Sequence, residues 1–179
     1  KPGRPVVTAV SQPSGLQVLE DLAQNNNTRL YHYKKDFSAR KQPSAPKYDY
    51  TGVQNRYNNL ALPRPGDHQK ENMCLALAAC ELIQERFASQ EERFPLTEAQ
   101  ILQGLASARW PGRLEYVQKD PLVILDGAHN DKAAKILATY LDQYLSDRKI
   151  TMVLGILDDK PYASMLKTLT AGADRIIFT

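Results

Sequence analysis

The residues Asp126-Gly127-Ala128-His129-Asn130 form a short polar segment between two stretches of different character. Leu122–Leu125, directly before it, is a continuous apolar run that is typical of a buried strand. Over residues 132–145 the apolar side chains recur at helical spacing. A strand, a loop and a helix in this order indicate an α/β fold, and such folds bind ligands at the carboxyl ends of their strands. The loop is therefore the first candidate for a site.

The side chains of this loop suit a nucleotide, but they also suit a simpler role. The carboxylate of Asp126 can accept hydrogen bonds from both hydroxyls of a ribose, and the imidazole of His129 can stack on a purine or hydrogen-bond to it. Gly127 between them lets the backbone turn tightly. Alternatively, Asp126 and Asn130 only cap the helix that follows. The local pattern leaves both interpretations open.

Composition limits the classes of protein to which the site can belong. The 179 residues, 42% of them hydrophobic, suffice for one ordinary domain or two small ones. A net charge of +3, from 23 basic and 20 acidic side chains, is too small to indicate a nucleic-acid or membrane surface. No apolar stretch approaches the roughly 18 to 20 residues of a membrane span, and no signal peptide opens the chain.

The cysteines and histidines indicate neither a metal site nor a disulfide framework. Cys74 and Cys80 share one apolar helical pattern and lack paired spacing, so we expect core residues in a reducing, cytoplasmic setting. The three histidines show no metal-ligand spacing either. We expect no metal ligand in this chain.

The pattern of elements changes near the only tryptophan, Trp110. Residues 48–53 and 56–62 alternate in the manner of an antiparallel hairpin, and a long helix begins at His68. A second helix follows Thr97, which can form a capping box with Gln100. Pro111 disfavours a helical conformation at Trp110 and so interrupts the helical pattern. We therefore predict two domains, residues 1–108 and 109–179.

The second predicted domain alternates strands with helices. Strands are expected at 114–117, 122–125, 150–154 and 175–178, and helices at 131–145 and 162–169. Such an order favours a parallel sheet with right-handed crossovers.

One segment of the first domain mixes aromatic and basic residues. Residues 31–37, with Arg40 and Lys41 nearby, have a composition that can mark a protein that binds single-stranded nucleic acid. More often such a run is a strand edge followed by a solvated loop. Together with the balanced charge, this interpretation indicates that the chain does not bind nucleic acid.

Five fragments of the chain resemble, in the same order, motifs of folylpolyglutamate synthase, including its bifunctional dihydrofolate synthase form, in the Mur ligase superfamily. They are Lys1-Pro2-Gly3-Arg4-Pro5-Val6-Val7, Gly66-Asp67-His68-Gln69-Lys70-Glu71-Asn72, Trp110-Pro111-Gly112-Arg113-Leu114-Glu115, Asp126-Gly127-Ala128-His129-Asn130 and Gly155-Ile156-Leu157-Asp158-Asp159-Lys160. The resemblance implies the C-terminal part of a central ATPase domain, followed by the first part of a Rossmann-like C-terminal ligase domain with a parallel sheet.

The resemblance also implies an ATP-dependent amide ligase. ATP phosphorylates a carboxylate of folate or dihydropteroate, and the amine of L-glutamate then displaces phosphate. By position, Asn72 looks like an adenine contact, Arg113 like the catalytic arginine that reaches the ATP phosphates, and Lys160 like a residue that helps to hold glutamate. In the same way, Asp126 looks like the ribose contact and His129 like a second adenine contact. Asn72 belongs to the first predicted domain, so it should converge with Asp126 and His129 on one cleft.

Parts of the family's machinery are absent from these 179 residues. No G-x-x-x-x-G-K-[ST] phosphate loop occurs, and the resemblance puts that loop and the Mg²⁺ ligands upstream of Lys1. We therefore expect the chain to be part of a longer, monomeric protein and to be inactive alone. The alternative is a binding module without catalysis, either a nucleotide-binding fragment or a degenerate homologue that kept Asp126 and His129.

Overall fold

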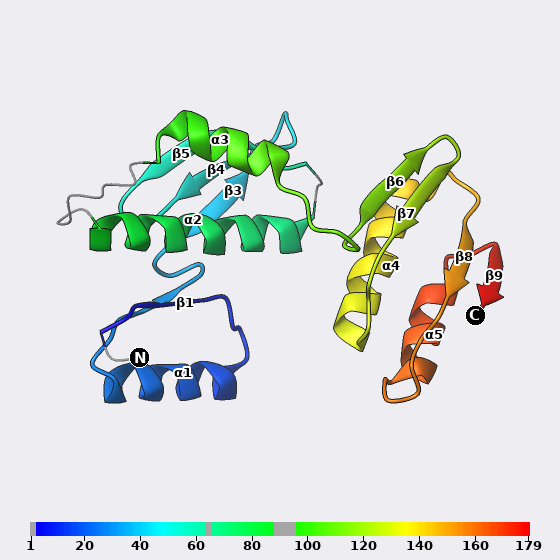
Figure 1. Ribbon diagram of the computed structural model, residues 1–179, viewed down its shortest axis with the longest axis horizontal. Coiled ribbons are helices and arrows are strands. Elements are labelled where there is room, and N and C mark those ends of the chain that lie inside the picture. Colours follow the sequence, from blue (N-terminus) through cyan, green and yellow to red (C-terminus); the bar gives the residue numbers. More distant parts are fainter. Residues whose placement is uncertain (1–2, 64–65, 88–95) are drawn as a thin grey trace. The chain divides into compact units, whose positions relative to one another are not determined.

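The computed structural model describes residues 3–63, 66–87 and 96–179, so Lys1 and Pro2 of the first motif lie outside the described residues. The chain divides into two compact units, Lys1–Ala108 and Arg109–Thr179 (Figure 1). The first unit contains β1 (Val6–Thr8), α1 (Pro13–Asn25), β2 (Leu30–His32), β3 (Ser38–Lys41), β4 (Lys47–Thr51), β5 (Arg56–Ala61), α2 (Asp67–Phe87) and α3 (Glu98–Ser107). The second contains β6 (Glu115–Lys119), β7 (Leu122–Leu125), α4 (Asp131–Leu145), β8 (Thr151–Leu154), α5 (Tyr162–Thr170) and β9 (Arg175–Phe178).

Two small sheets form the first unit. Strands β1 and β2 pair in parallel and are joined by α1, whereas β3, β4 and β5 form an antiparallel sheet. The pairing of β4 with β5 confirms the expected hairpin. Helix α2 contacts both β1 and β3, and α3 contacts β5. Figure 1 shows α2 between the β1–α1 segment and the three-stranded sheet.

The core of this unit is rich in aromatic residues. Tyr31, Tyr33 and Phe37 are buried in it, so their rings are not available to stack on nucleic-acid bases. The Cys74 side chain is also buried there, and burial raises the pKa of its thiol to about 12. A thiol of such high pKa is a poor nucleophile, in agreement with the expected core role.

Helix α3 begins as the sequence indicates. The side chain of Thr97 accepts a hydrogen bond from the Gln100 backbone N–H at 3.2 Å, and Gln100 Oε1 accepts one from the Thr97 backbone N–H at 2.9 Å. These reciprocal bonds satisfy two N–H groups that a helix terminus would otherwise leave unpaired. The predicted capping box is confirmed.

The second unit combines an antiparallel and a parallel pair of strands. Strands β8 and β9 are parallel and joined by α5, as expected, but β6 is antiparallel to β7. The parallel placement predicted for residues 114–117 is therefore wrong. Only Asp120 and Pro121 separate β6 from β7, and a two-residue connection can join antiparallel strands only, because parallel strands need a long crossover. The α/β class itself is confirmed.

Helix α4 holds these two pairs of strands in one unit. Its residues Leu137 and Leu141 pack against the buried cluster that contains Met152 and Met165, and also against the cluster that contains Leu114. The amphipathic face predicted for residues 131–145 thus packs against the rest of the unit. Among the helices of the described residues, none has the length and apolar character needed to cross a membrane.

A buried carboxylate meets a glycine inside the first unit. Glu81 of α2 is only 1% exposed, and its Oε2 accepts a hydrogen bond from the Gln54 backbone N–H at 3.0 Å. Gln54 lies in the turn between β4 and β5, which begins at Gly52. A Cβ atom at Gly52 would overlap with Glu81 Oε1 and lie 2.5 Å from Tyr50 Cε1. Position 52 therefore has no room for a side chain.

We expect Gly52→Ala to lower the free energy of unfolding by about 2 kcal/mol, because overpacking of this kind forces a buried side chain and the turn to move. The matched control is Gly104→Ala in α3, where a Cβ atom would meet nothing within 4 Å. Removal of a helical glycine should stabilise that variant by roughly 0.5–1 kcal/mol. Urea unfolding of both variants measures the difference, and equal stabilities would contradict the overlap at Gly52.

Candidate functional site

The loop after β7 continues directly into α4. Asn130 is the N-cap of that helix, and its Oδ1 accepts a hydrogen bond from the Ala133 backbone N–H at 2.9 Å. The capping interpretation is thus confirmed for Asn130. It is wrong for Asp126, whose carboxylate binds other groups.

Both carboxylate oxygens of Asp126 accept backbone hydrogen bonds. Oδ2 accepts from Leu114 N–H at 2.8 Å, and Oδ1 accepts from Ala128 N–H at 2.9 Å. Leu114 precedes β6, whereas Ala128 follows β7, so one side chain links two segments of the unit. Charge-assisted hydrogen bonds of this kind are stronger than neutral ones.

The same two segments meet at Gly127. Its N–H donates to Gly112 O at 2.7 Å, and its carbonyl accepts from Arg113 Nη1 at 2.5 Å. The ring of His129 also lies on this carbonyl, with Nδ1 at 3.0 Å from Gly127 O. A Cβ atom at position 127 would lie 2.9 Å from Arg113 Nη1, so a side chain there would displace the guanidinium from its present position. Arg113, Asp126 and His129, three of the predicted site residues, are therefore neighbours.

The charged and aromatic side chains of this cluster differ in exposure. Asp126 is half-buried, while Arg113 and His129 are exposed. A carbonyl can only accept hydrogen bonds, so His129 Nδ1 carries the proton on that side and the neutral ring keeps Nε2 as an acceptor. The guanidinium of Arg113 carries a positive charge and donates from Nη1 to Gly127 O. The cluster thus presents both a cation and an imidazole at the carboxyl end of β7.

The roles of two residues of this arrangement were not predicted from the sequence. Leu114 has a positive φ of 45°, and its side chain is only 3% exposed. Glu115 Oε2 accepts a hydrogen bond from Gly112 N–H at 2.7 Å. A leucine in the left-handed region is held against a strain of about 1–3 kcal/mol. Glu115 stands three residues after Gly112, a spacing that could have suggested such a turn.

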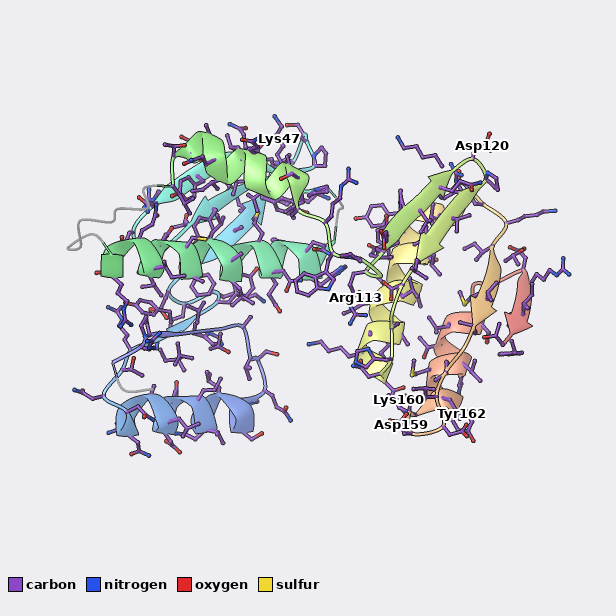
Figure 2. The ribbon with its side chains drawn as sticks, in the orientation of Figure 1. Lys47, Arg113, Asp120, Asp159, Lys160 and Tyr162 are labelled. Atoms are coloured by element: carbon purple, nitrogen blue, oxygen red, sulfur yellow. The ribbon has the colours of Figure 1, made fainter. Side chains whose placement is uncertain are left out.

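Lys160 lies in the loop after β8, the second strand of this unit that leads into a helix. Its ammonium forms an ion pair with Asp159 Oδ2 at 2.6 Å. Helix α5 begins just after it and is tied to the start of α4 by a hydrogen bond from Ser164 Oγ to Asp131 Oδ1 at 2.5 Å. Figure 2 shows Lys160 next to Asp159 and Tyr162 at the end of the unit where α5 begins, and Arg113 near the start of β6.

Asn72 belongs to the first unit. It lies in the second turn of α2 and its side chain is exposed, so it is not part of the core of that unit. An exposed amide at this position is compatible with contact to a ligand. Its convergence with Asp126 and His129 stays a prediction.

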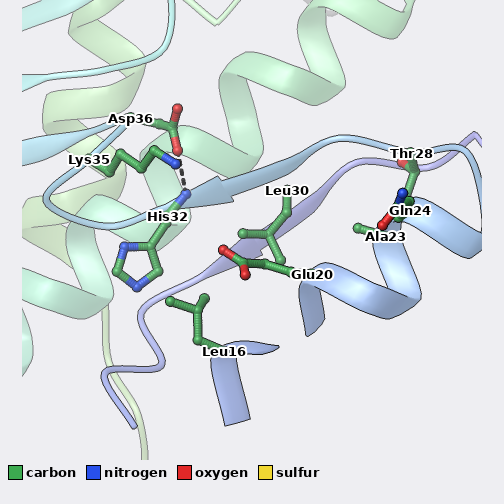
Figure 3. A pocket seen from close by; sticks show the side chains of 9 residues that line it. All are labelled: Leu16, Glu20, Ala23, Gln24, Thr28, Leu30, His32, Lys35 and Asp36. Atoms are coloured by element: carbon green, nitrogen blue, oxygen red, sulfur yellow. Dashed lines mark hydrogen bonds between the residues drawn. The ribbon is translucent and has the colours of Figure 1, made fainter. Parts of the chain in front are cut away.

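Described residues of the first unit line two of its cavities, and none of the predicted site residues is among those that line either of them. One, of about 320 Å³, lies between α1 and β2 (Figure 3). Two of its polar residues contact neighbours, since His32 N–H donates to Asp36 Oδ2 at 2.7 Å and His32 Nε2 lies 2.9 Å from Val10 O. The other, of about 570 Å³, is mainly apolar and has Arg4 and Arg86 in its lining.

The described residues include no cluster of metal ligands. Within residues 3–63, 66–87 and 96–179, no three His, Cys, Asp or Glu side chains lie close enough together to hold an ion. These residues therefore do not fit Mg²⁺.

Comparison with known proteins relates both units to one family. Residues 112–179 match the family model for the Mur ligase glutamate ligase domain. The dihydrofolate synthase/folylpolyglutamate synthase of Bacillus subtilis is 33% identical over 181 residues, which cover 99% of this chain and 41% of that enzyme. The chain therefore spans about two fifths of the length of this relative.

Solved structures give the same result. Folylpolyglutamate synthase from Mycobacterium tuberculosis, complexed with ADP, superposes with a TM-score of 0.84 at 28% identity, over 99% of this chain and 39% of that one. A folylpolyglutamate synthase complex with AMPPCP and folate gives a TM-score of 0.85 at 32% identity, over 99% of this chain and 43% of that one. The chain belongs to the folylpolyglutamate synthase and dihydrofolate synthase family of the Mur ligase superfamily.

Proposed function

We propose that the chain contributes the nucleotide-facing part of an ATP-dependent ligase that adds L-glutamate to the γ-carboxyl of a folate, with tetrahydrofolate as the expected form. The observation that carries this proposal is the cluster of Arg113, Gly127 and His129 at the carboxyl end of β7, inside the segment that matches the glutamate ligase domain. Relatives solved with ADP, or with AMPPCP and folate, support it.

The proposed chemistry has two steps. A carboxylate oxygen of folate attacks the γ-phosphorus of ATP, the bond to the ADP oxygen breaks, and an acyl phosphate forms. The amine of glutamate then attacks the acyl carbon, phosphate leaves, and the amine loses a proton as the amide forms. Phosphoryl transfer depends mainly on positioning and on positive charge at the transferring group.

In this scheme Arg113 is the catalytic residue, because its guanidinium supplies charge and a planar set of donors for phosphate oxygens. His129 offers an imidazole to the adenine, and Asn72 of the first unit offers an amide that can pair with an adenine edge. Lys160 is the proposed contact for a carboxylate of glutamate, after exchange of its present partner Asp159. Asp126 is the proposed contact for the ribose hydroxyls, because each of its carboxylate oxygens accepts only one backbone hydrogen bond and has a second acceptor site.

The natural gene product that carries this sequence should release ADP only when a reduced folate and glutamate are both present. The 179-residue chain alone should not, because it contains no phosphate loop to hold the β- and γ-phosphates. Coupled ADP assays and mass spectrometry of the folate product measure both results. If the gene product binds ATP but does not form the glutamyl product, the alternative of a non-catalytic binding module is favoured. Turnover by the 179 residues alone would contradict the statement that a phosphate loop is required.

A further inference from the structure

We propose that Glu115 is a positioning residue, whose carboxylate holds the turn that carries Arg113 in the conformation that directs the guanidinium to Gly127 O. This inference rests on the proposed function, in which the charge of Arg113 acts on the transferring phosphate. Glu115 is the first residue of β6 and is half-buried. Its Oε2 accepts a hydrogen bond from the Gly112 backbone N–H at 2.7 Å, so the carboxylate contacts the turn directly.

The four residues Trp110-Pro111-Gly112-Arg113 form a β-turn. Arg113 N–H donates to Trp110 O at 3.2 Å, and this bond closes the turn. Proline at the second position and a glycine with a φ of 67° at the third match a type II turn. The closing bond uses the first carbonyl and the fourth N–H, so it leaves the N–H of the third residue for another acceptor. Glu115 is that acceptor.

Gly112 joins this turn to the loop after β7. Its N–H donates to Glu115, and its carbonyl accepts from the Gly127 N–H at 2.7 Å. The Gly127 carbonyl accepts in turn from Arg113 Nη1 at 2.5 Å. The guanidinium is therefore held at its backbone by the turn and at its tip by the loop. A shift of Gly112 changes the distance between these two points, and with it the direction of the guanidinium.

The backbone beside Arg113 is strained, and a carboxylate holds it on each side. Leu114 has a positive φ of 45°, a conformation that a leucine keeps only when its surroundings enforce it. Its side chain is buried, and its N–H donates to Asp126 Oδ2 at 2.8 Å. Before Arg113, the Gly112 N–H donates to Glu115. Hydrogen bonds to a charged acceptor are stronger than neutral ones, so loss of Glu115 should loosen one side of this strained segment.

Two variants of the natural gene product test the role of the acceptor oxygen. Glu115→Ala removes it, and kcat should fall about tenfold while the KM for ATP changes less than about twofold, because the lost interaction acts through Arg113 in the chemical step. Glu115→Gln keeps a neutral acceptor oxygen and should restore kcat to within about threefold of wild type. Wild-type kcat in Glu115→Ala would overturn the inference. A glutamine variant as slow as the alanine variant would also overturn it, since the acceptor oxygen would then not matter.

A double-mutant cycle tests whether Glu115 acts through Arg113. In the Arg113→Ala background, Glu115→Ala should lower kcat by less than about twofold, because the group that it positions is gone. A smaller folded fraction would instead lower kcat by the same factor in both backgrounds, and losses that multiply in this way would overturn the inference. If Glu115→Ala does not fold, the cycle is run with Glu115→Gln, whose loss of kcat should likewise disappear. The matched control is Asp142→Ala, at an exposed carboxylate of α4, which should leave kcat and KM unchanged.

Hydrogen exchange separates this inference from the proposed function. If the natural gene product forms no glutamyl product, the proposed function fails, and the amides of the turn still test the positioning. Those of Gly112, Arg113 and Gly127 should exchange at least about tenfold faster in Glu115→Ala than in wild type, whereas the amides of α5 should keep their rates. Equal exchange at the three amides would overturn the inference. Faster exchange in α5 as well would mean a general loss of stability and would overturn it too.

Discussion

Glu81→Ala is expected to lower the free energy of unfolding by about 3 kcal/mol, because it leaves a buried cavity and removes the acceptor for backbone N–H groups in the β4–β5 turn. The side chain is 1% exposed, and its Oε2 receives the Gln54 N–H at 3.0 Å. Urea unfolding measures the effect. Glu85→Ala, at an exposed position of the same helix, is the control and should change stability by less than about 0.5 kcal/mol. Equal stabilities of the two variants would contradict a structural role for Glu81.

The same carboxyl group predicts a pH dependence. Burial raises the pKa of Glu81 above 4.5, its ordinary value, although hydrogen bonds from the backbone of Gln54, Val53 and Asn55 oppose the rise. An acid with a higher pKa in the folded state binds its proton more tightly when folded, so its stabilising contribution is full below the unfolded pKa and is lost as pH rises through the folded pKa. In the variant Glu81→Gln the carboxyl group is replaced by an amide, which does not ionise in this pH range. The stability of wild type relative to this variant should therefore fall as pH rises above 4.5, and a difference that stays constant with pH would contradict the pKa shift.

Arg113→Ala should reduce kcat of the natural gene product about 100-fold, with a change in the KM for ATP of less than about fivefold, because its charge acts on the transferring phosphate more than on ground-state binding. Arg113→Lys keeps the charge but loses the planar set of donors, so an intermediate kcat is expected. Folate-dependent ADP formation under steady-state conditions measures both variants.

The control for this prediction is Arg148→Ala, an exposed arginine just beyond α4 that should leave the kinetics unchanged. If Arg113→Ala raised the KM for ATP as much as it lowered kcat/KM, the guanidinium would serve binding rather than the chemical step. Wild-type kcat in that variant would remove Arg113 from the catalytic machinery.

Local signals in the sequence were sufficient for most elements. The amphipathic pattern of residues 131–145 predicted α4, and the spacing of Thr97 and Gln100 predicted the capping box of α3, because both depend on neighbours within one or two helical turns. The parallel orientation predicted for β6 was wrong because it was based only on the order of strands and helices. The two-residue connection through Asp120 and Pro121 is also local, and its length excludes a parallel crossover.

The candidate site was only partly predictable. The resemblance to the family and the position of the polar loop behind β7 followed from the sequence, which left the capping role of Asn130 as one of two interpretations. Only the tertiary structure showed that Asp126 binds Leu114, twelve residues earlier, and that Arg113 and His129 meet on Gly127 O. Contacts between segments distant in the chain impose no periodicity on a residue such as Leu114, because such contacts form only when packing brings the two backbones together. The link between Asp126 and Leu114 was therefore decided by the fold.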